Sequence, residues 1–450
     1  MGNQENTECQ RPVFDRNTIE QFLFFGFEPR VDKVNPFRIL GDWSPDVTSR
    51  AHMETESTLV RRGVRAWQAA IEDYAGRPGP TGQQVVFLSG GLDSRAILGG
   101  LLRHFGRSEI VAATFGQPGE QDYDFAQQIA KAANVRHETL ETFSVDWTTE
   151  ELVKSVLART LPVPFAFGQR YLSYCLHRRF GKDNAFWDGL MGGSVSGQLL
   201  PCHGDNPDWS AALAHFVVQN KVKRAECLVT PGFQPTAWLP QAPLNSMEYL
   251  PYIDQLDVAL RQTCYIQKRL MREYVTRTPF VSKHWVNFML ALPSEHRTNQ
   301  YLYKEILKEA FPKLFSLPGT TLGGLPVTTS RWGHRKWTLE KKVVRRMPAV
   351  KRILPNGEAL VAPQSANQAI RGGMVRKAEI RSLCEQNIHD LHARGAVDWL
   401  DVRPLWEQHV AGLVQNEPLV NVLLALEINL KAADARPASP ATTVSAVETP

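Results

Sequence analysis

The stretch that decides the fold is VVFLSGGLDSRAIL, residues 85–98, where an apolar run stops at two adjacent glycines before a second apolar segment begins. The run VVFL (85–88) has the composition of a short buried strand, and SRAILGGLLRHFG (94–106) has that of a helix. Ser89 to Ser94 therefore form the turn that joins them. In a parallel sheet such a turn lies at the carboxyl edge, where helix N-termini bind anions.

The residue types in this turn suit a diphosphate bound together with a metal ion. Gly90 and Gly91 allow backbone amides to approach an anion closely, and Ser89 and Ser94 add hydroxyl donors. Asp93 would repel a phosphate, so we expect it to bind a magnesium ion that bridges phosphate oxygens. No lysine follows the glycines, which excludes the GxxxxGK[ST] loop. A glycine turn without any ligand is the alternative.

The neighbouring segments predict an α/β protein with a parallel sheet wrapped by helices. Helical periodicity marks residues 54–74 and 122–135, a second buried strand is predicted over 109–116, and residues 136–143 could supply a third strand. From about residue 148 the chain reads as mostly helical. We expect one domain over 54–431, with a nucleotide-binding sheet at about 82–200 and a helical portion at about 201–431.

The two ends of the chain differ from this domain in composition. Residues 1–53 are broken by prolines, and we interpret them as an N-terminal remnant or linker segment. Residues 432–450 are small, polar and proline-containing, which predicts a disordered tail.

Bulk composition places the chain among ordinary globular proteins. It has 450 residues, 43% hydrophobic and 22% charged, and its six cysteines lie far apart. That spacing argues against a structural zinc site or a disulfide framework. No apolar run is long enough to span a membrane and the N-terminus does not resemble a signal peptide, so we expect a cytoplasmic protein.

The motif LSGGLDS (88–94) resembles the pyrophosphate-binding motif, or PP-loop, of the ATP pyrophosphatase superfamily, in its asparagine-synthetase branch. The resemblance implies an adenine nucleotide alpha hydrolase-like fold and an enzyme that uses ATP and Mg²⁺ to adenylate a carboxylate, releasing pyrophosphate. It extends to residues 114–138, which are similar to the family's second strand and helix. The implied nucleotide-binding residues are Leu88, Ser89, Gly90, Gly91, Leu92, Asp93, Ser94 and Phe115.

Two later segments carry the implied catalytic residues. RTPFVSKHWVNFMLALPSEHR (277–297) resembles the family's arginine-proline-phenylalanine segment, and YLYKEILKEAFPKL (301–314) resembles its lysine-bearing helix. Lys304 is then the residue that stabilises the oxyanion when an amine attacks the adenylate, the alternative being a solvated lysine. Glu273 and Tyr274 are candidate bases for that amine; ordinary helix residues are the alternative.

The chain departs from the family pattern at its second acidic motif. The family has Ser-Gly-x-Gly-x-Asp, whereas WDGLMGGSVSG (187–197) carries Ser194 directly after Gly193. Asp188, before the glycines, is our candidate for the second metal ligand beside Asp93. The alternative is a weakened metal site. Arg95, where the synthetases usually have serine, is expected to contact phosphate or to pair with an acid.

A glutaminase domain is not expected, because Gly2 stands where its cysteine nucleophile would be and fewer than 90 residues precede the loop. We therefore expect a stand-alone synthetase domain that forms an amide between a small-molecule or peptide carboxylate and an amine or ammonia. Ammonia would be free or come from a separate ammonia-supplying protein.

Two other functions remain open at this stage. One is a tRNA-modifying ATP pyrophosphatase that uses the basic segment 331–352, which has nine Lys or Arg residues against one acid. The other is a non-catalytic nucleotide-binding or scaffold protein. The basic segment would bind RNA, close over the pyrophosphate, or form a solvated helix face. We favour the synthetase and do not expect a nucleic-acid partner.

Overall fold

The computed structural model describes residues 14–29, 54–201, 208–247, 250–346 and 366–436. Its centre is one five-stranded sheet with the strand order β3-β2-β1-β4-β5, in which all neighbours are parallel. The strands are β1 (Gln84–Phe87), β2 (Ile110–Gly116), β3 (Arg136–Glu141), β4 (Ala185–Trp187) and β5 (Thr276–Arg277). The predicted α/β class with a parallel sheet is confirmed.

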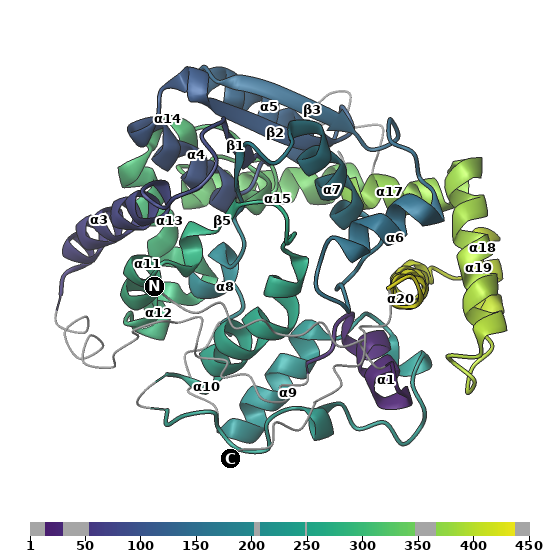
Figure 1. Cartoon of the computed structure of the whole chain (residues 1–450). Coiled ribbons are helices and arrows are strands. Elements are labelled where there is room, and N and C mark those ends of the chain that lie inside the picture. The colour runs from purple at the N-terminus through teal and green to yellow at the C-terminus, as the bar shows by residue number, and fades with distance from the viewer. Residues whose placement is uncertain (1–13, 30–53, 202–207, 248–249, 347–365, 437–450) are drawn as a thin grey trace, which may run out of the picture.

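Both faces of this sheet are buried, and side chains alternate between them with the period of a strand. Val86 packs in one cluster with α4 (Leu92–His104) and α5 (Gln121–Ala133). Its neighbour Val85 packs on the opposite face with Leu176 of α7 (Gln169–Phe180). Figure 1 shows the sheet with α4 and α5 at the top of the molecule and the helical portion below.

Three helices brace the α4 face of the sheet. Helix α3 (Glu56–Ala75) packs against α11 (Lys283–Leu290) and α13 (Tyr301–Ala310). Trp67 of α3 is fully buried, and its ring lies 4.5 Å from that of Phe280 and 5.2 Å from that of Trp285. Its indole N–H donates to the carbonyl of Ala96 at 3.3 Å, which ties α3 to α4.

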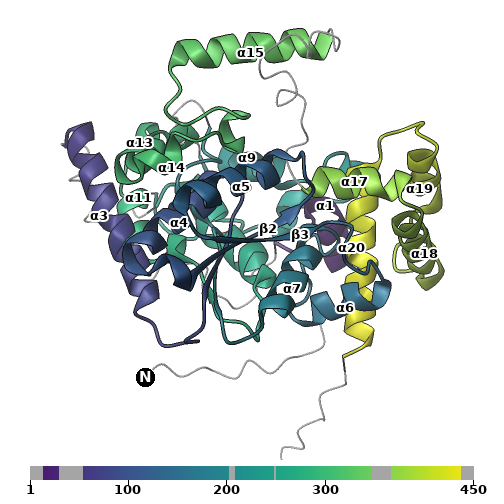
Figure 2. The same cartoon turned by 90° about the horizontal axis from the view of Figure 1, so that it is seen from above.

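The rest of the molecule is helical, as predicted, and its centre is α20 (Glu417–Asp434), whose residues are mostly buried. Helix α20 packs against α1, α6 and α18, on the right of Figure 1. Helix α15 carries residues 331–346 of the basic segment and lies along the outside of the molecule (Figure 2), whereas residues 347–352 lie outside the described residues. The remaining α-helices are α1 (Arg16–Phe25), α6 (Thr149–Leu157), α8 (Gly192–Val195), α9 (Trp209–Asn220), α10 (Tyr252–Asp254), α12 (Ser294–Arg297), α14 (Pro312–Phe315), α15 (Arg331–Arg346), α17 (Ala366–Arg376), α18 (Ala378–Arg394) and α19 (Arg403–Val410).

The predicted boundaries need three corrections. Residues 16–25, which we assigned to a linker, form α1, because Phe22 and Phe25 are fully buried in the helical core. Strand β5 lies outside the range predicted for the sheet. Helix α20 runs to Asp434, into the predicted tail, because Ala432 and Ala433 pack in the same core. Residues 1–13, 30–53 and 437–450 lie outside the described residues. Across the described ranges, no helix is long and apolar enough to cross a membrane.

Candidate active site

The turn between β1 and α4 is held by its own hydroxyl groups. The amide of Ser89 donates to the hydroxyl of Ser94 at 3.1 Å, and the amide of Gly91 donates to the hydroxyl of Ser89 at 3.2 Å. Gly91 is the N-cap of α4 and makes no side-chain cap itself. The loop therefore presents small donors and the free amides of a helix N-terminus at the carboxyl edge of the sheet, as predicted.

Gly90 is the buried part of this loop. Its amide donates to Oδ1 of Asp122, on α5, at 3.2 Å, and its carbonyl accepts from the amide of Thr320 at 3.0 Å. A Cβ atom at Gly90 would lie 2.8 Å from the Thr320 methyl group and 3.0 Å from the ring of Phe125, so only glycine fits. Burial raises the pKa of Asp122 to about 6, although the Thr320 hydroxyl and the Gly90 amide act in the opposite direction.

Arg95, on α4, links the loop to the segment that leads to Thr320. Its guanidinium is fully buried and donates to the carbonyls of Gly90 at 3.1 Å and Pro318 at 2.7 Å, and also to those of Leu314 and Leu317. It thus binds backbone rather than the phosphate or acid that we expected. This arginine fixes the segment that ends at Thr320 over the loop.

Asp93 is enclosed by the glycines of the second motif. Its Oδ1 accepts from the hydroxyl of Tyr303 at 2.9 Å. A Cβ atom at Gly189 would lie 2.8 Å from Cβ of Asp93, and one at Gly192 would lie 2.5 Å from its Oδ2. Burial raises the pKa of Asp93 to about 7, with Tyr303 and the Gly193 amide lowering it and the nearby Asp188 raising it further. These glycines let a buried carboxylate pack against backbone.

Asp188 follows β4 and lies between Asp93 and two arginines. Its Oδ1 accepts from the amide of Leu190 at 3.0 Å. Burial raises its pKa, while the guanidiniums of Arg269 and Arg170 act in the opposite direction. Within the described ranges, no group of three or more His, Cys, Asp or Glu side chains forms a metal site. Two adjacent buried carboxylates nevertheless fit a magnesium ion that takes its remaining oxygens from phosphate and water.

The two arginines come from distant segments, and a third arginine joins them. Arg170 lies in the first turn of α7, and Arg269 ends the helical stretch that follows α10. Arg159 is almost completely buried and donates to the backbone carbonyls of Arg269 at 3.0 Å and Arg170 at 2.8 Å. Sequence reasoning missed all three, because a buried arginine has no pattern that separates it from a surface one.

These groups meet in a cavity of about 210 Å³ at the carboxyl ends of β1, β2 and β4, which we call the carboxyl-edge cavity. Of the residues predicted to bind nucleotide or metal, Leu88, Ser89, Phe115 and Asp188 line it. Arg170, Arg269 and Asp122 complete the polar part of its wall. The structure therefore brings the predicted adenine side and the predicted metal side to one place.

A family model described as Queuosine biosynthesis protein QueC matches residues 83–164, which run from β1 through the loop and past β3. This segment is thus similar to PP-loop ATP pyrophosphatases. The match covers less than a fifth of the chain and does not distinguish the asparagine-synthetase branch. Among curated proteins, none matches the chain.

Lys304, on α13, directs its ammonium group to a backbone carbonyl. It is adjacent to Tyr303, the residue that binds Asp93, and its ammonium donates to the carbonyl of Asn299 at 2.7 Å. Burial lowers its pKa, with Glu305 acting in the opposite direction. The catalytic role of Lys304 stays a prediction.

The structure does not bring Glu273 or Tyr274 to the PP-loop. Glu273 is exposed and forms an ion pair with Lys182 at 2.5 Å. Lys182 precedes β4, so this ion pair lies at the amino edge of the sheet. The ring of Tyr274 packs against those of His177 and Phe186, at 5.0 and 5.7 Å. Neither side chain lies at the carboxyl edge, so this placement gives no support for a base there.

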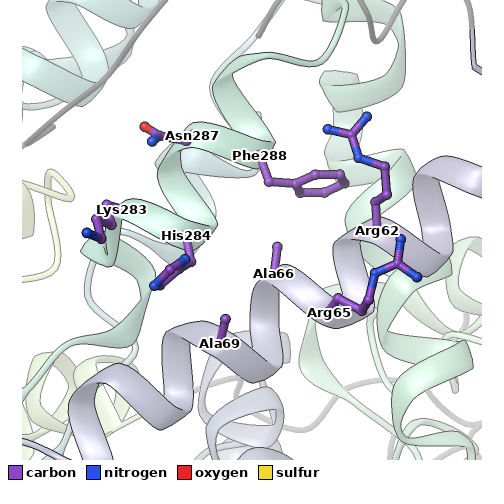
Figure 3. Close-up of a pocket in the computed structure, with 8 residues that line it drawn as sticks. All are labelled: Arg62, Arg65, Ala66, Ala69, Lys283, His284, Asn287 and Phe288. Atoms are coloured by element: carbon purple, nitrogen blue, oxygen red, sulfur yellow. The ribbon is translucent and has the colours of Figure 1, made fainter.

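A more open groove of about 630 Å³ lies between α3 and α11 (Figure 3). Arg62 and Arg65 of α3 and Lys283 and His284 of α11 give it a basic lining, with Phe288 pointing toward α3. The groove shares no lining residue with the carboxyl-edge cavity in the described part of the chain. We therefore treat it as a basic surface separate from the PP-loop.

Proposed function

We propose that this protein is an ATP-dependent ligase that adenylates a substrate carboxylate and passes the acyl group to ammonia or an amine. The observation that carries the proposal is the carboxyl-edge cavity, where PP-loop residue Ser89, the acid Asp188 and two arginines meet. ATP is the nucleotide implied by the PP-loop match, and its cleavage to AMP and pyrophosphate creates an anionic leaving group that such a site is built to hold.

The chain's own residues divide the task between two sides. On the loop side, the amides of α4 and the hydroxyls of Ser89 and Ser94 bind the departing pyrophosphate. On the other side, Arg170 and Arg269 balance the negative charge that develops at the α-phosphorus. A magnesium ion held by Asp93 and Asp188 would neutralise phosphate oxygens. Preorganised charge and positioning account for the acceleration, because no proton transfer is needed in this half-reaction.

Nucleotide binding requires a rearrangement at Gly90. Its amide is occupied by Asp122, and Thr320 covers its α-carbon. The carboxyl-edge cavity is also smaller than the roughly 300 Å³ at which most small-molecule sites begin. We infer that the segment around Thr320 moves away from the loop when the phosphates enter.

The test is exchange of labelled pyrophosphate into ATP in the presence of a panel of carboxylic acids. We expect exchange that depends on the acid and that falls by about a hundredfold or more in Asp93→Asn. Glu150→Gln, on the exposed surface of α6, is the matched control and should exchange normally. Release of orthophosphate in place of pyrophosphate would contradict adenylation. ATP binding without exchange for any acid would support the non-catalytic alternative.

A second candidate, a tRNA-modifying ATP pyrophosphatase, is favoured by one specific observation, the match to the queuosine biosynthesis family model. The basic groove of Figure 3 and helix α15 supply positive surface that an RNA would need. Binding of tRNA that weakens steeply with salt, and that is lost on reversing the charges of Arg65 and Lys283, would support this candidate. Exchange that is independent of tRNA would favour the ligase.

A further inference from the structure

A second cavity of about 480 Å³ adjoins the carboxyl-edge cavity, and we call it the side cavity. Gln169 and Arg170 line both, so the two spaces meet at the start of α7. Its volume falls within the range of small-molecule sites. A ligand in the side cavity therefore lies next to the carboxyl-edge cavity.

Aromatic rings form one wall of the side cavity. They belong to Phe165, Phe167 and Tyr265. Phe165 has a φ of 46°, in the left-handed region that a bulky residue rarely adopts, and its ring occupies the space above Gly26. The rings of Phe165 and Tyr265 meet edge to face at 6.2 Å. Backbone strain of this kind persists where surrounding structure imposes it, and it concentrates at functional sites.

Helix α20 holds the backbone that precedes the aromatic wall in the sequence. Asn429 of α20 is fully buried and clamps the backbone of Val163, accepting from its amide at 2.6 Å and donating to its carbonyl at 3.1 Å. Phe167 packs against Trp147 at 5.5 Å. The aromatic wall is thus preformed, which lowers the entropic cost of binding a flat ligand.

The charges of the side cavity favour an anion at one end. Arg170 and Lys223 line it against a single acid, Glu417. Arg170 donates to the hydroxyl of Tyr265, and its buried Nε has no hydrogen-bond partner within the described part of the chain. Because Arg170 and Asp188 both line the carboxyl-edge cavity, an anion bound to this guanidinium lies beside the cavity in which we propose that the α-phosphate is attacked.

We propose that the side cavity binds the acid that is adenylated, and that this acid carries a planar aromatic ring. Its carboxylate pairs with Arg170 at the junction, and its ring lies against Phe165, Phe167 and Tyr265. This inference rests on the proposed adenylation for its chemistry. The binding of aromatic acids can be measured without ATP, so the two proposals can fail separately.

The test begins with binding of benzoate and indole-3-acetate, measured by ligand-observed NMR and calorimetry. Benzamide and indole-3-acetamide are the neutral controls, and succinate is the aliphatic control. We expect both aromatic acids to bind at least about tenfold more tightly than the amides or succinate. Equal binding of succinate, or no binding of either aromatic acid, would overturn the inference.

A matched pair of variants locates the site. Asn421 of α20 lines the side cavity and is partly exposed, so Asn421→Trp should fill the space while Asn421→Ala leaves it open. We expect the tryptophan variant to lose at least about tenfold in affinity for aromatic acids and the alanine variant to stay within about threefold. Both should bind ATP normally. Unchanged binding of aromatic acids by a folded Asn421→Trp protein would refute the assignment.

A further variant keeps the test decisive if the tryptophan disturbs folding. Phe165→Ala removes a ring without adding volume, and it should weaken aromatic acids while leaving succinate unaffected. Pyrophosphate exchange then separates the two proposals. Aromatic acids that bind but support no exchange would contradict adenylation and leave the side cavity as their site. Exchange with aliphatic acids alone would contradict the side-cavity proposal and leave adenylation intact.

Discussion

The two sides of the carboxyl-edge cavity are assembled in opposite ways. The PP-loop side is a single short segment, Ser89 to Ser94, whose hydroxyls and amides bind one another. The opposite side brings together Arg170, Asp188 and Arg269 from three separate parts of the chain, with Arg159 holding two of them by their backbones. The PP-loop side is therefore encoded by one short stretch of sequence, whereas the opposite side depends on the whole fold.

The largest effect is expected where the two sides touch, at Gly192. A methyl group there would displace the carboxylate of Asp93, so Gly192→Ala should reduce pyrophosphate exchange on the order of a thousandfold. Gly232→Ala is the matched control, because a Cβ atom at that position meets nothing within 4 Å. Near-normal exchange by Gly192→Ala would show that the two sides do not depend on each other.

A smaller effect is expected from the distant side alone. Arg269→Met removes one of the two guanidiniums that line the carboxyl-edge cavity, and kcat/KM for ATP should fall about a hundredfold with the melting temperature nearly unchanged. The exposed Arg272→Met is the control. If both variants lost activity equally, the position of Arg269 in the cavity would have no special role.

On the PP-loop side, the negative charge of Asp122 should weaken anion binding. Its pKa of about 6 would rise further beside a bound pyrophosphate, so affinity should be highest below pH 6 and decline as pH rises through that value. Asp122→Asn should bind pyrophosphate about tenfold more tightly at pH 7.5 and lose much of this pH dependence. Calorimetry at pH 5.5 and 7.5 measures both effects. Weaker binding by the variant would instead identify Asp122 as a residue that organises the loop.

The smallest effect is expected at the amino edge of the sheet, away from either side of the cavity. Glu273 is exposed and its partner Lys182 is exposed too, so Glu273→Gln should change turnover by less than about twofold. Steady-state rates across pH 6–9 check this. A large loss with a shifted pH profile would restore Glu273 as a catalytic base and contradict its placement in the structure.

Sequence patterns anticipated the local side well, for physical reasons. Strands β1 and β2 carry enough apolar residues to be recognised, and the turn after β1 has a distinctive composition, whereas β3 has only one apolar residue, Leu140. Strand β5 has only two residues and cannot produce a periodic signal. Helix α1 was missed because prolines surround it, although its phenylalanines are core residues.

At the site, residues that belong to a recognisable motif were again easier to predict than residues whose partners are distant in the sequence. Asp188 was proposed because it belongs to a glycine-rich motif, and Leu88 and Phe115 because of the resemblance to the family; all three line the carboxyl-edge cavity. Asp122 and the buried arginines had no such context, since their function depends on partners far away in the sequence. Tyr303 could have been suggested by its position beside Lys304, but nothing in the pattern indicated that its hydroxyl reaches Asp93.

The side-chain amide of Asn429 limits where this protein could be divided into fragments. Its hydrogen bonds to Val163 join helix α20 to the segment that leads to Phe165 and Phe167 of the side cavity. The chain therefore has no natural boundary near residue 200 at which the helical portion could be removed. A fragment that ends there would keep β1 to β4 but would lose β5, Tyr265 of the side cavity and the helix that holds Val163. A chimera that joined this fragment to the helices of another protein would need a replacement for the buried hydrogen bonds between Asn429 and Val163.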